Sequence, residues 1–102
     1  MKTPRNSPQI HPGEILIEEF MRPLELSAYR IAQVTALPAS RLAEIIAGRR
    51  SVTPDTALRL GAALGTTPEF WLNLQATHDL RAVARTNAKD YRSIPSLIPC
   101  PA

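Results

Sequence analysis

Arginine residues are concentrated in the middle of this 102-residue chain, where their guanidinium groups could contact nucleic acid. The net charge is only +3, so the distribution of charge is more informative than its total. Residues 26–60 contain two acidic residues, Glu44 and Asp55, and five basic ones: Arg30, Arg41, Arg49, Arg50 and Arg59. Because a guanidinium group matches both phosphate oxygens and the edge of guanine, this composition favours a surface that binds DNA.

Two short helices joined by a tight turn are predicted for this segment, over about residues 28–47. Ser27 is a good N-cap for the first helix, which should end near Thr35 and point Ile31 and Val34 inward. Pro38 opens the second helix, Gly48 ends it, and its buried face contains Leu42, Ile45 and Ile46. In such a pair the first helix contacts the DNA backbone and the second enters the major groove.

The exposed face of the second helix consists of small or polar side chains, which can lie close to base edges. A face that only meets solvent is more often rich in Glu and Lys. Backbone N–H groups and side chains at the start of the first helix can bind phosphate. The candidate DNA-binding residues are therefore Ser27, Tyr29, Arg30, Pro38, Ala39, Ser40, Arg41, Glu44, Arg49 and Arg50.

Several of these residues have more than one possible role. Ser40 and Arg41 contact DNA or are simply exposed. Glu44 accepts a hydrogen bond from cytosine N4, repels misplaced phosphates or pairs with an arginine. Arg49 and Arg50 contact phosphate, or they interact favourably with the C-terminal end of the preceding helix.

The rest of the chain also indicates an all-α fold with five helices. Residues 1–10 are predicted to be a flexible arm and residues 88–102 a tail, on either side of a domain at residues 11–87. A first helix begins at Pro12 and should end near Met21, because Pro23 follows. Thr53-Pro54 and Thr67-Pro68 each start a further helix, the last one running to about Thr86.

The last helix carries both core and surface candidates. Phe70 and Trp71 are expected to be core residues rather than a partner-binding anchor. A long terminal helix often has surplus apolar surface, so a homodimer seam is expected at Leu74, Leu80 and Val83.

Other function classes find little support in the sequence. There is no nucleophile with a matching base, and the glycines form no phosphate-binding loop, so an enzyme is not expected. His11 and His78 have no possible ligand partner nearby beyond a lone Glu14 or Asp79, and one cysteine, Cys100, cannot form a zinc site alone, so neither metal nor cofactor is expected. No apolar run approaches the roughly 18 residues of a membrane span, and no signal peptide is visible, so a cytoplasmic location is expected.

Four motifs in order carry a resemblance to a known family: HPGE at 11–14, GRRSVT at 48–53, DTALRL at 55–60 and TPEFWLNLQ at 67–75. The helix-turn-helix segment resembles the Xre/Cro family, whose domains are lambda-repressor-like. The stretch from residue 11 to about 87 resembles the HigA-type, or VapI-like, antitoxins. The resemblance implies a protein that neutralises a RelE-like mRNA endonuclease toxin and represses its own operon, as a dimer on a palindromic operator in double-stranded DNA.

Two other functions remain open from the sequence. The chain could be a stand-alone transcriptional regulator without a toxin, or a protein-interaction module that has lost DNA binding. One residue departs from the family pattern: Ala36 occupies a turn position where glycine is common. Because a Cβ costs about 1 kcal/mol or more in a left-handed conformation, a somewhat different turn is expected here.

Overall fold

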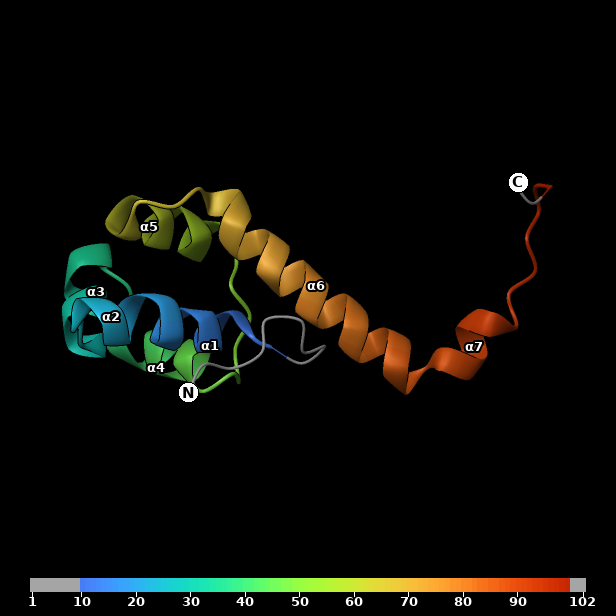
Figure 1. Ribbon diagram of the computed structural model, residues 1–102, viewed down its shortest axis with the longest axis horizontal. Helices are drawn as coiled ribbons and strands as arrows, with labels where there is room; N and C mark the ends of the chain where they lie inside the picture. Colours follow the sequence, from blue (N-terminus) through green and yellow to red (C-terminus); the bar gives the residue numbers. More distant parts are fainter. Residues whose placement is uncertain (1–9, 100–102) are drawn as a thin grey trace.

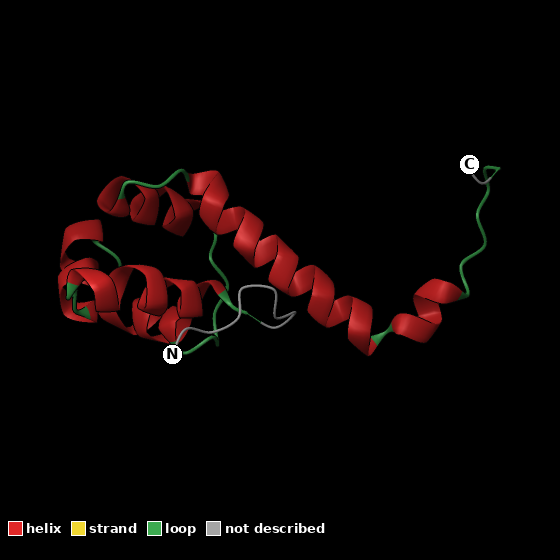
Figure 2. Ribbon diagram, in the orientation of Figure 1, coloured by secondary structure: helices red, strands yellow, loops and turns green. Residues whose placement is uncertain are grey.

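The computed structural model describes residues 10–99, and every regular element in this range is a helix (Figures 1 and 2). The first helical stretch runs without a break through α1 (Pro12–Ile15), the π-helical segment η1 (Leu16–Met21) and α2 (Arg22–Leu24). It is followed by α3 (Ala28–Thr35), α4 (Ala39–Ile46), α5 (Pro54–Leu64), the long α6 (Pro68–Thr86) and the short α7 (Ala88–Arg92). The predicted all-α class, with a helix-turn-helix in α3 and α4, is confirmed.

Local hydrogen bonds explain where α3, α5 and α6 begin. The hydroxyl groups of Ser27, Thr53 and Thr67 each accept a hydrogen bond from the backbone N–H three residues later, at 3.0, 3.3 and 3.1 Å. Each bond satisfies one of the N–H groups that a helix start leaves without a partner. These three helix starts are the ones that the sequence predicts.

The end of the first helical stretch differs from the prediction. The helix does not stop at Met21 but continues through Pro23 to Leu24, and Glu25 ends it in the left-handed conformation with φ of 54°. The N–H of Arg22 bonds to the carbonyl of Ile17, five residues back, so the turn before the proline is widened. A widened turn gives the proline ring room that a regular α-helix would not.

The core lies where the first helical stretch, α4, α5 and the first half of α6 meet. Its most completely buried side chains include Leu16, Leu42, Ile45, Leu60 and Trp71, all at most 1% exposed. Trp71 also donates from its indole N–H to the Thr66 hydroxyl at 2.7 Å. The prediction of a core residue is confirmed for Trp71 but wrong for Phe70, which is 37% exposed at the edge of the aromatic contacts with Phe20 and Trp71. Leu42 and Ile45 anchor α4 on the same core.

Gly13 allows α1 to pack directly on the backbone of α4. A Cβ built on Gly13 would overlap the carbonyl oxygen of Ile45 and come within 3.0 Å of that of Ile46. Both carbonyls belong to the last turn of α4. The glycine of the HPGE motif therefore allows α1 to hold the C-terminal end of α4, the second helix of the helix-turn-helix, in place.

The second half of α6 projects from this core as an arm (Figure 1). The molecule measures 52 × 29 × 26 Å, and its radius of gyration is 16.5 Å, against about 13 Å for a compact domain of this length. Beyond Asn87 the chain forms α7 and then a loop, in which Leu97 is 97% exposed. The region predicted as a tail thus contains one short helix.

The buried face of α3 differs from the prediction. Val34 was expected to point inward, but it is 56% exposed. The buried residues of α3 are Ile31, Ala32 and Thr35, because α5 packs against that face. At the N-terminus Ile10 belongs to the core rather than to a flexible arm, while residues 1–9 of that predicted arm lie outside the described residues.

Candidate DNA-binding surface

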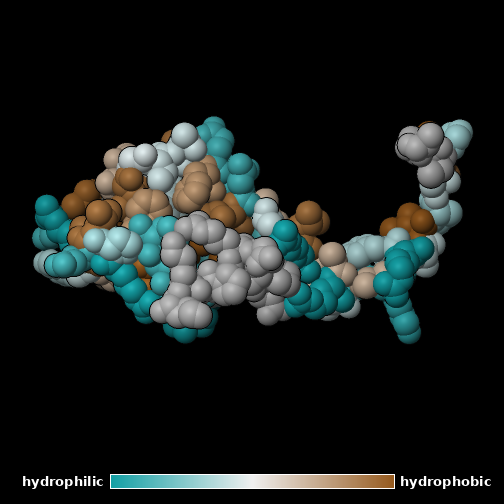
Figure 3. All heavy atoms as spheres, viewed as in Figure 1, coloured by the Kyte–Doolittle hydropathy of each residue, from teal (hydrophilic) through white to brown (hydrophobic). Residues whose placement is uncertain are grey.

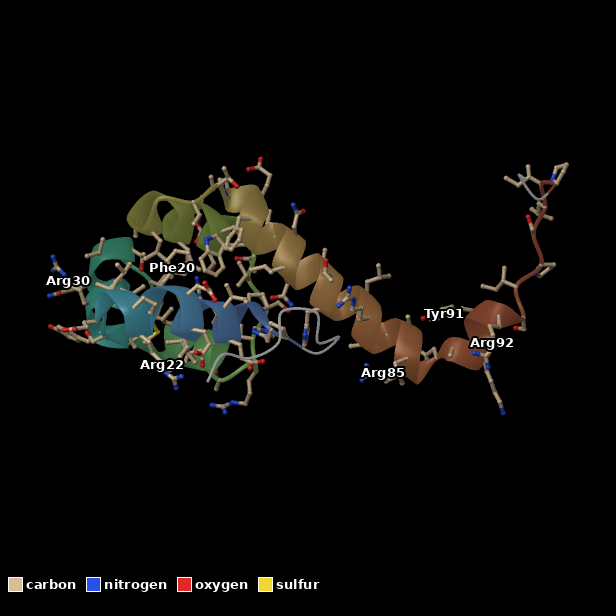
Figure 4. All side chains as sticks on the ribbon, viewed as in Figure 1. Phe20, Arg22, Arg30, Arg85, Tyr91 and Arg92 are labelled. Atoms are coloured by element: carbon tan, nitrogen blue, oxygen red, sulfur yellow. The ribbon has the colours of Figure 1, made fainter. Side chains whose placement is uncertain are left out.

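One part of the candidate surface is the exposed face of α3. Ser27 caps the helix, and Tyr29 and Arg30 in its first turn are both exposed. Arg30 Nη1 donates to Gln33 Oε1 at 3.5 Å, and Gln33 Nε2 donates to the Tyr29 hydroxyl at 3.4 Å. Figure 4 shows Arg30, in the first turn of α3, pointing away from the body of the domain. The three side chains form an exposed polar cluster suited to phosphate contact.

Gln33 is a residue that sequence reasoning missed. It lies one turn after Tyr29, so the i, i+4 spacing on a predicted helix was the available signal. Its amide supplies both a donor and an acceptor, which is the chemistry that adenine recognition uses.

The turn between α3 and α4 keeps the left-handed geometry that favours glycine, although its residue is alanine. Ala36 has φ of 61° and ψ of 24°, so the expectation of a differently shaped turn is wrong. A Cβ in this conformation costs roughly 1–2 kcal/mol. Leu37 follows the turn and is buried in the core, at 4% exposed, which fixes the path of the chain into α4.

The outer face of α4 is formed by short side chains. Leu42 and Ile45 bury its inner face, while Ala39, Ser40, Ala43 and Ala47 are exposed and Arg41 is half-buried. Pro38 precedes the helix as its N-cap residue, with no side-chain capping bond. Short side chains let the backbone of a helix approach a partner closely, as a helix in the major groove must.

Glu44 of α4 partly neutralises the positive charge of the loop that follows, which carries Arg49 and Arg50. Arg50 Nε donates to Glu44 Oε1 at 2.7 Å, and both side chains remain well exposed to solvent. The alternative of Glu44 pairing with an arginine is therefore the one present in this structure. Arg49 is exposed, and its backbone N–H bonds to the Glu44 carbonyl at 2.8 Å. No described ion pair involves Arg49, so its guanidinium group is accessible to a phosphate.

Buried polar contacts from α6 hold this loop in place. Gln75 Oε1 accepts a hydrogen bond from the N–H of Val52 at 2.8 Å, and Gln75 Nε2 donates to Asp79 at 2.9 Å. One turn later, the rings of His78 and His11 meet edge to face, with centroids 5.0 Å apart. The projecting arm is thus connected to the loop that carries Arg49 and Arg50.

His11 has a structural role that the sequence did not predict. Its Nδ1 atom accepts the N–H of Gly13 at 2.9 Å and so caps α1. Burial lowers its pKa from the ordinary 6.5, and the neighbouring His78 lowers it further, against opposing effects from Asp79, the Arg50 backbone and Glu14. His78 Nδ1 is buried and has no hydrogen-bond partner.

Metal binding and membrane insertion find no support in the described part of the chain. Within residues 10–99, no three His, Cys, Asp or Glu side chains lie together as a metal site requires. None of the helices in that range is both long and hydrophobic enough to cross a membrane. Cys100 lies outside the described residues.

The three residues predicted for a dimer seam differ in their surroundings. Leu80 is 71% exposed and Val83 47% exposed, both on the projecting half of α6. Leu74 lies nearer the domain and packs against the core of its own chain. Leu80 and Val83 are therefore available to a partner, whereas Leu74 mainly attaches the arm to the domain.

Comparisons with known proteins point to one family. The chain is 42% identical over 92 residues to virulence-associated protein I of Dichelobacter nodosus, covering 90% of this chain and 82% of that protein. A HigA-family addiction module antidote protein from Coxiella burnetii has a TM-score of 0.82 at 43% identity, covering 88% of this chain and 99% of that one. This chain belongs to the HigA-type family of Xre helix-turn-helix antitoxins. No family model matches the sequence.

A second HigA structure bears on the DNA-binding surface. The antitoxin HigA of Pseudomonas aeruginosa, solved with the higBA promoter, has a TM-score of 0.83 at 33% identity and covers 88% of this chain and 99% of that one. These family members are antitoxins rather than enzymes, as the sequence predicts for this chain.

Proposed function

We propose that this HigA-type chain is the DNA-binding antitoxin of a type II toxin–antitoxin module. It represses its own operon as a homodimer on a palindromic operator, and it neutralises a RelE-like mRNA endonuclease. The observation that carries the proposal is the outer face of α4, where short side chains around Ser40 and Arg41 leave room for base edges. Support also comes from the P. aeruginosa HigA, which was solved with promoter DNA.

In this proposal α4 lies in the major groove and α3 crosses the backbone. Arg41 donates to guanine O6 and N7, Ser40 contacts a neighbouring base and Ala39 packs against a thymine methyl group. Phosphate contacts come from the polar cluster at the start of α3 and from Arg49. Pro38 brings the start of α4 close to the DNA without a long side chain.

A palindromic operator requires a protein with two-fold symmetry. The arm of α6 supports a homodimer, because Leu80 and Val83 are exposed in this chain and would be covered by a second arm. Figure 3 shows hydrophobic side chains on the surface of the projecting arm. Gln75 and His78 connect the arm to the domain. Their contacts would then fix how the loop with Arg49 and Arg50 is oriented relative to the dimer interface.

The toxin half of the proposal is supported by family membership. The operator and the translated mRNA that a RelE-like toxin cuts are both in the cytoplasm, so the proposal places the antitoxin there. A small toxin-like reading frame beside the gene would separate an antitoxin from a stand-alone regulator.

One variant separates the two activities. Arg41→Ala should relieve repression of a reporter driven by the upstream DNA, yet it should still rescue cells that express the neighbouring toxin-like gene. Arg22→Ala, which removes an exposed arginine paired with Glu18 outside the candidate surface, is the matched control and should retain both activities. A chain that neither represses the reporter nor rescues the cells would contradict the proposal.

A further inference from the structure

The turn of the helix-turn-helix is closed by side chains rather than by the backbone pattern seen at the end of α5. After α5, the N–H groups of Gly65 and Thr66 both donate to the Gly61 carbonyl, at 2.9 and 3.1 Å. After α3, the N–H of Leu37 donates to the Thr35 hydroxyl at 3.3 Å. That hydroxyl in turn donates to the Ile31 carbonyl at 2.7 Å. Thr35 therefore connects the turn to the last turn of α3.

Arg59 of α5 binds the same residue through its backbone carbonyl. Its Nη1 donates to the Thr35 carbonyl at 2.9 Å, across 24 positions of sequence. Its Nε donates to Asp55 Oδ2 at 3.0 Å, one helical turn earlier on α5. The carboxylate thus orients the guanidinium group toward the end of α3. A positive charge there interacts favourably with the carbonyl groups that a helix end leaves exposed.

The position of this contact matters because of the residue that follows. Ala36 is held in the left-handed conformation, which residues with a Cβ rarely adopt. Pro38 provides no side-chain cap for α4. The angle of α4 against α3 therefore depends on contacts outside the turn, and the Arg59 bond to Thr35 is one of them.

We propose that Arg59 is a positioning residue for operator recognition: with Asp55 it holds the Thr35-Ala36 turn and so sets the angle at which α4 meets DNA. Arg59 does not touch DNA in this account. Arg59 is one of the five arginines in residues 26–60, but its hydrogen bonds are directed to protein atoms. The inference rests on the proposed DNA-binding function and adds a residue that acts through the turn.

Substitutions at the turn and at Arg59 test this together. Arg59→Ala should weaken binding to the operator about tenfold, close to 1.4 kcal/mol, and leave a scrambled duplex and the salt dependence unchanged. Adding Ala36→Gly should restore most of the operator affinity, because glycine adopts the left-handed conformation without the help of Arg59. Arg22→Ala is the matched control, since it removes an exposed arginine with an i, i+4 carboxylate but no bond to a turn.

The measurements are anisotropy titrations at two salt concentrations and thermal unfolding of each variant. Equal losses on both duplexes, with a salt slope lower by about 0.9, would make Arg59 a phosphate ligand and overturn the inference. Unchanged binding, or a loss that Ala36→Gly does not restore, would also overturn it. If Arg59→Ala does not fold, Arg59→Met takes its place with the same expected pattern, because methionine keeps an unbranched apolar stem but removes the donors and the charge.

Failure of the proposed function has a different signature. A wild-type chain that binds neither duplex would overturn both proposals. The turn contact would still be measurable in such a chain, because Arg59→Ala would destabilise the wild type more than it destabilises the Ala36→Gly variant. Operator binding by the wild type, with no effect of Arg59→Ala, would overturn this inference alone.

Discussion

Replacing Glu44 by glutamine should increase the affinity of the chain for all DNA. The carboxylate holds Arg50 at 2.7 Å, and the two side chains are 42% and 49% exposed. An ion pair this exposed is worth about 0–1 kcal/mol, so it is weak enough to be exchanged for a phosphate. Glutamine removes the competing charge and frees Arg50. The expected gain is therefore at most about fivefold at low salt.

The salt dependence gives the sharper measure of this prediction. One additional phosphate contact steepens the slope of log K against log salt by about 0.9. Between about 50 and 200 mM salt, Glu44→Gln should therefore lose about threefold more affinity than the wild type. Anisotropy titrations of operator and scrambled duplexes at both salt concentrations measure both quantities.

A matched control is available on the first helical stretch. Glu18 pairs with Arg22 at the same 2.7 Å but lies outside the candidate surface, so Glu18→Gln should change neither affinity nor slope. A loss of operator affinity in Glu44→Gln, with scrambled DNA unaffected, would show that Glu44 reads a base. With that result, the Glu44–Arg50 ion pair would not be what limits phosphate binding.

Three further predictions address the frame that holds the surface. Gly13→Ala should destabilise the chain by about 1–3 kcal/mol, because its Cβ would overlap the Ile45 carbonyl; urea unfolding measures this, and an unchanged midpoint would contradict the close approach. Leu80→Asp should convert a dimer to a monomer in light scattering, whereas a mass that stays dimeric would move the seam elsewhere. Folding stability should fall as the pH drops below 6.5, since burial lowers the pKa of His11 in the folded state and the unfolded chain then binds the proton more readily. Thermal unfolding at about pH 7.5 and about pH 5.5 should show a smaller difference in His11→Asn, and an equal difference would contradict this assignment.

The parts of the fold that local chemistry determines could be predicted from the sequence. Ser27, Thr53 and Thr67 cap their helices as expected, since a cap depends on residues within one turn. Gly48 follows α4 in the left-handed conformation, with φ of 79°. The short residues on the outer face of α4 could also be predicted, because helical periodicity alone separates them from Leu42 and Ile45.

The errors occurred where the outcome depends on distant parts of the chain. Val34 was predicted to be buried because it lies three residues after Ile31, but α5 packs on a different side of α3. Helix periodicity shows that a face is apolar at about the right spacing, yet it does not show which helix will cover it. The proline at position 23 was misread because a π-helical turn is not visible in composition.

The contacts that hold the candidate site in place join residues far apart in sequence. Val52 and Gln75 are 23 positions apart, and Thr35 and Arg59 are 24 apart. No spacing rule connects such pairs, so Gln75 and Arg59 received no role in positioning the site from sequence alone. Gln75 lies four residues after Trp71 on the same predicted face, and this spacing was the available signal, since a buried polar side chain requires a partner.

The most direct test of this account is fluorescence anisotropy of the wild-type chain with the DNA immediately upstream of its own gene. A scrambled duplex of the same length is the control, and both are titrated at two salt concentrations. We predict tight binding to the upstream DNA, well above the control at both concentrations. Equally weak binding to the two duplexes would contradict the claim that α3 and α4 read an operator.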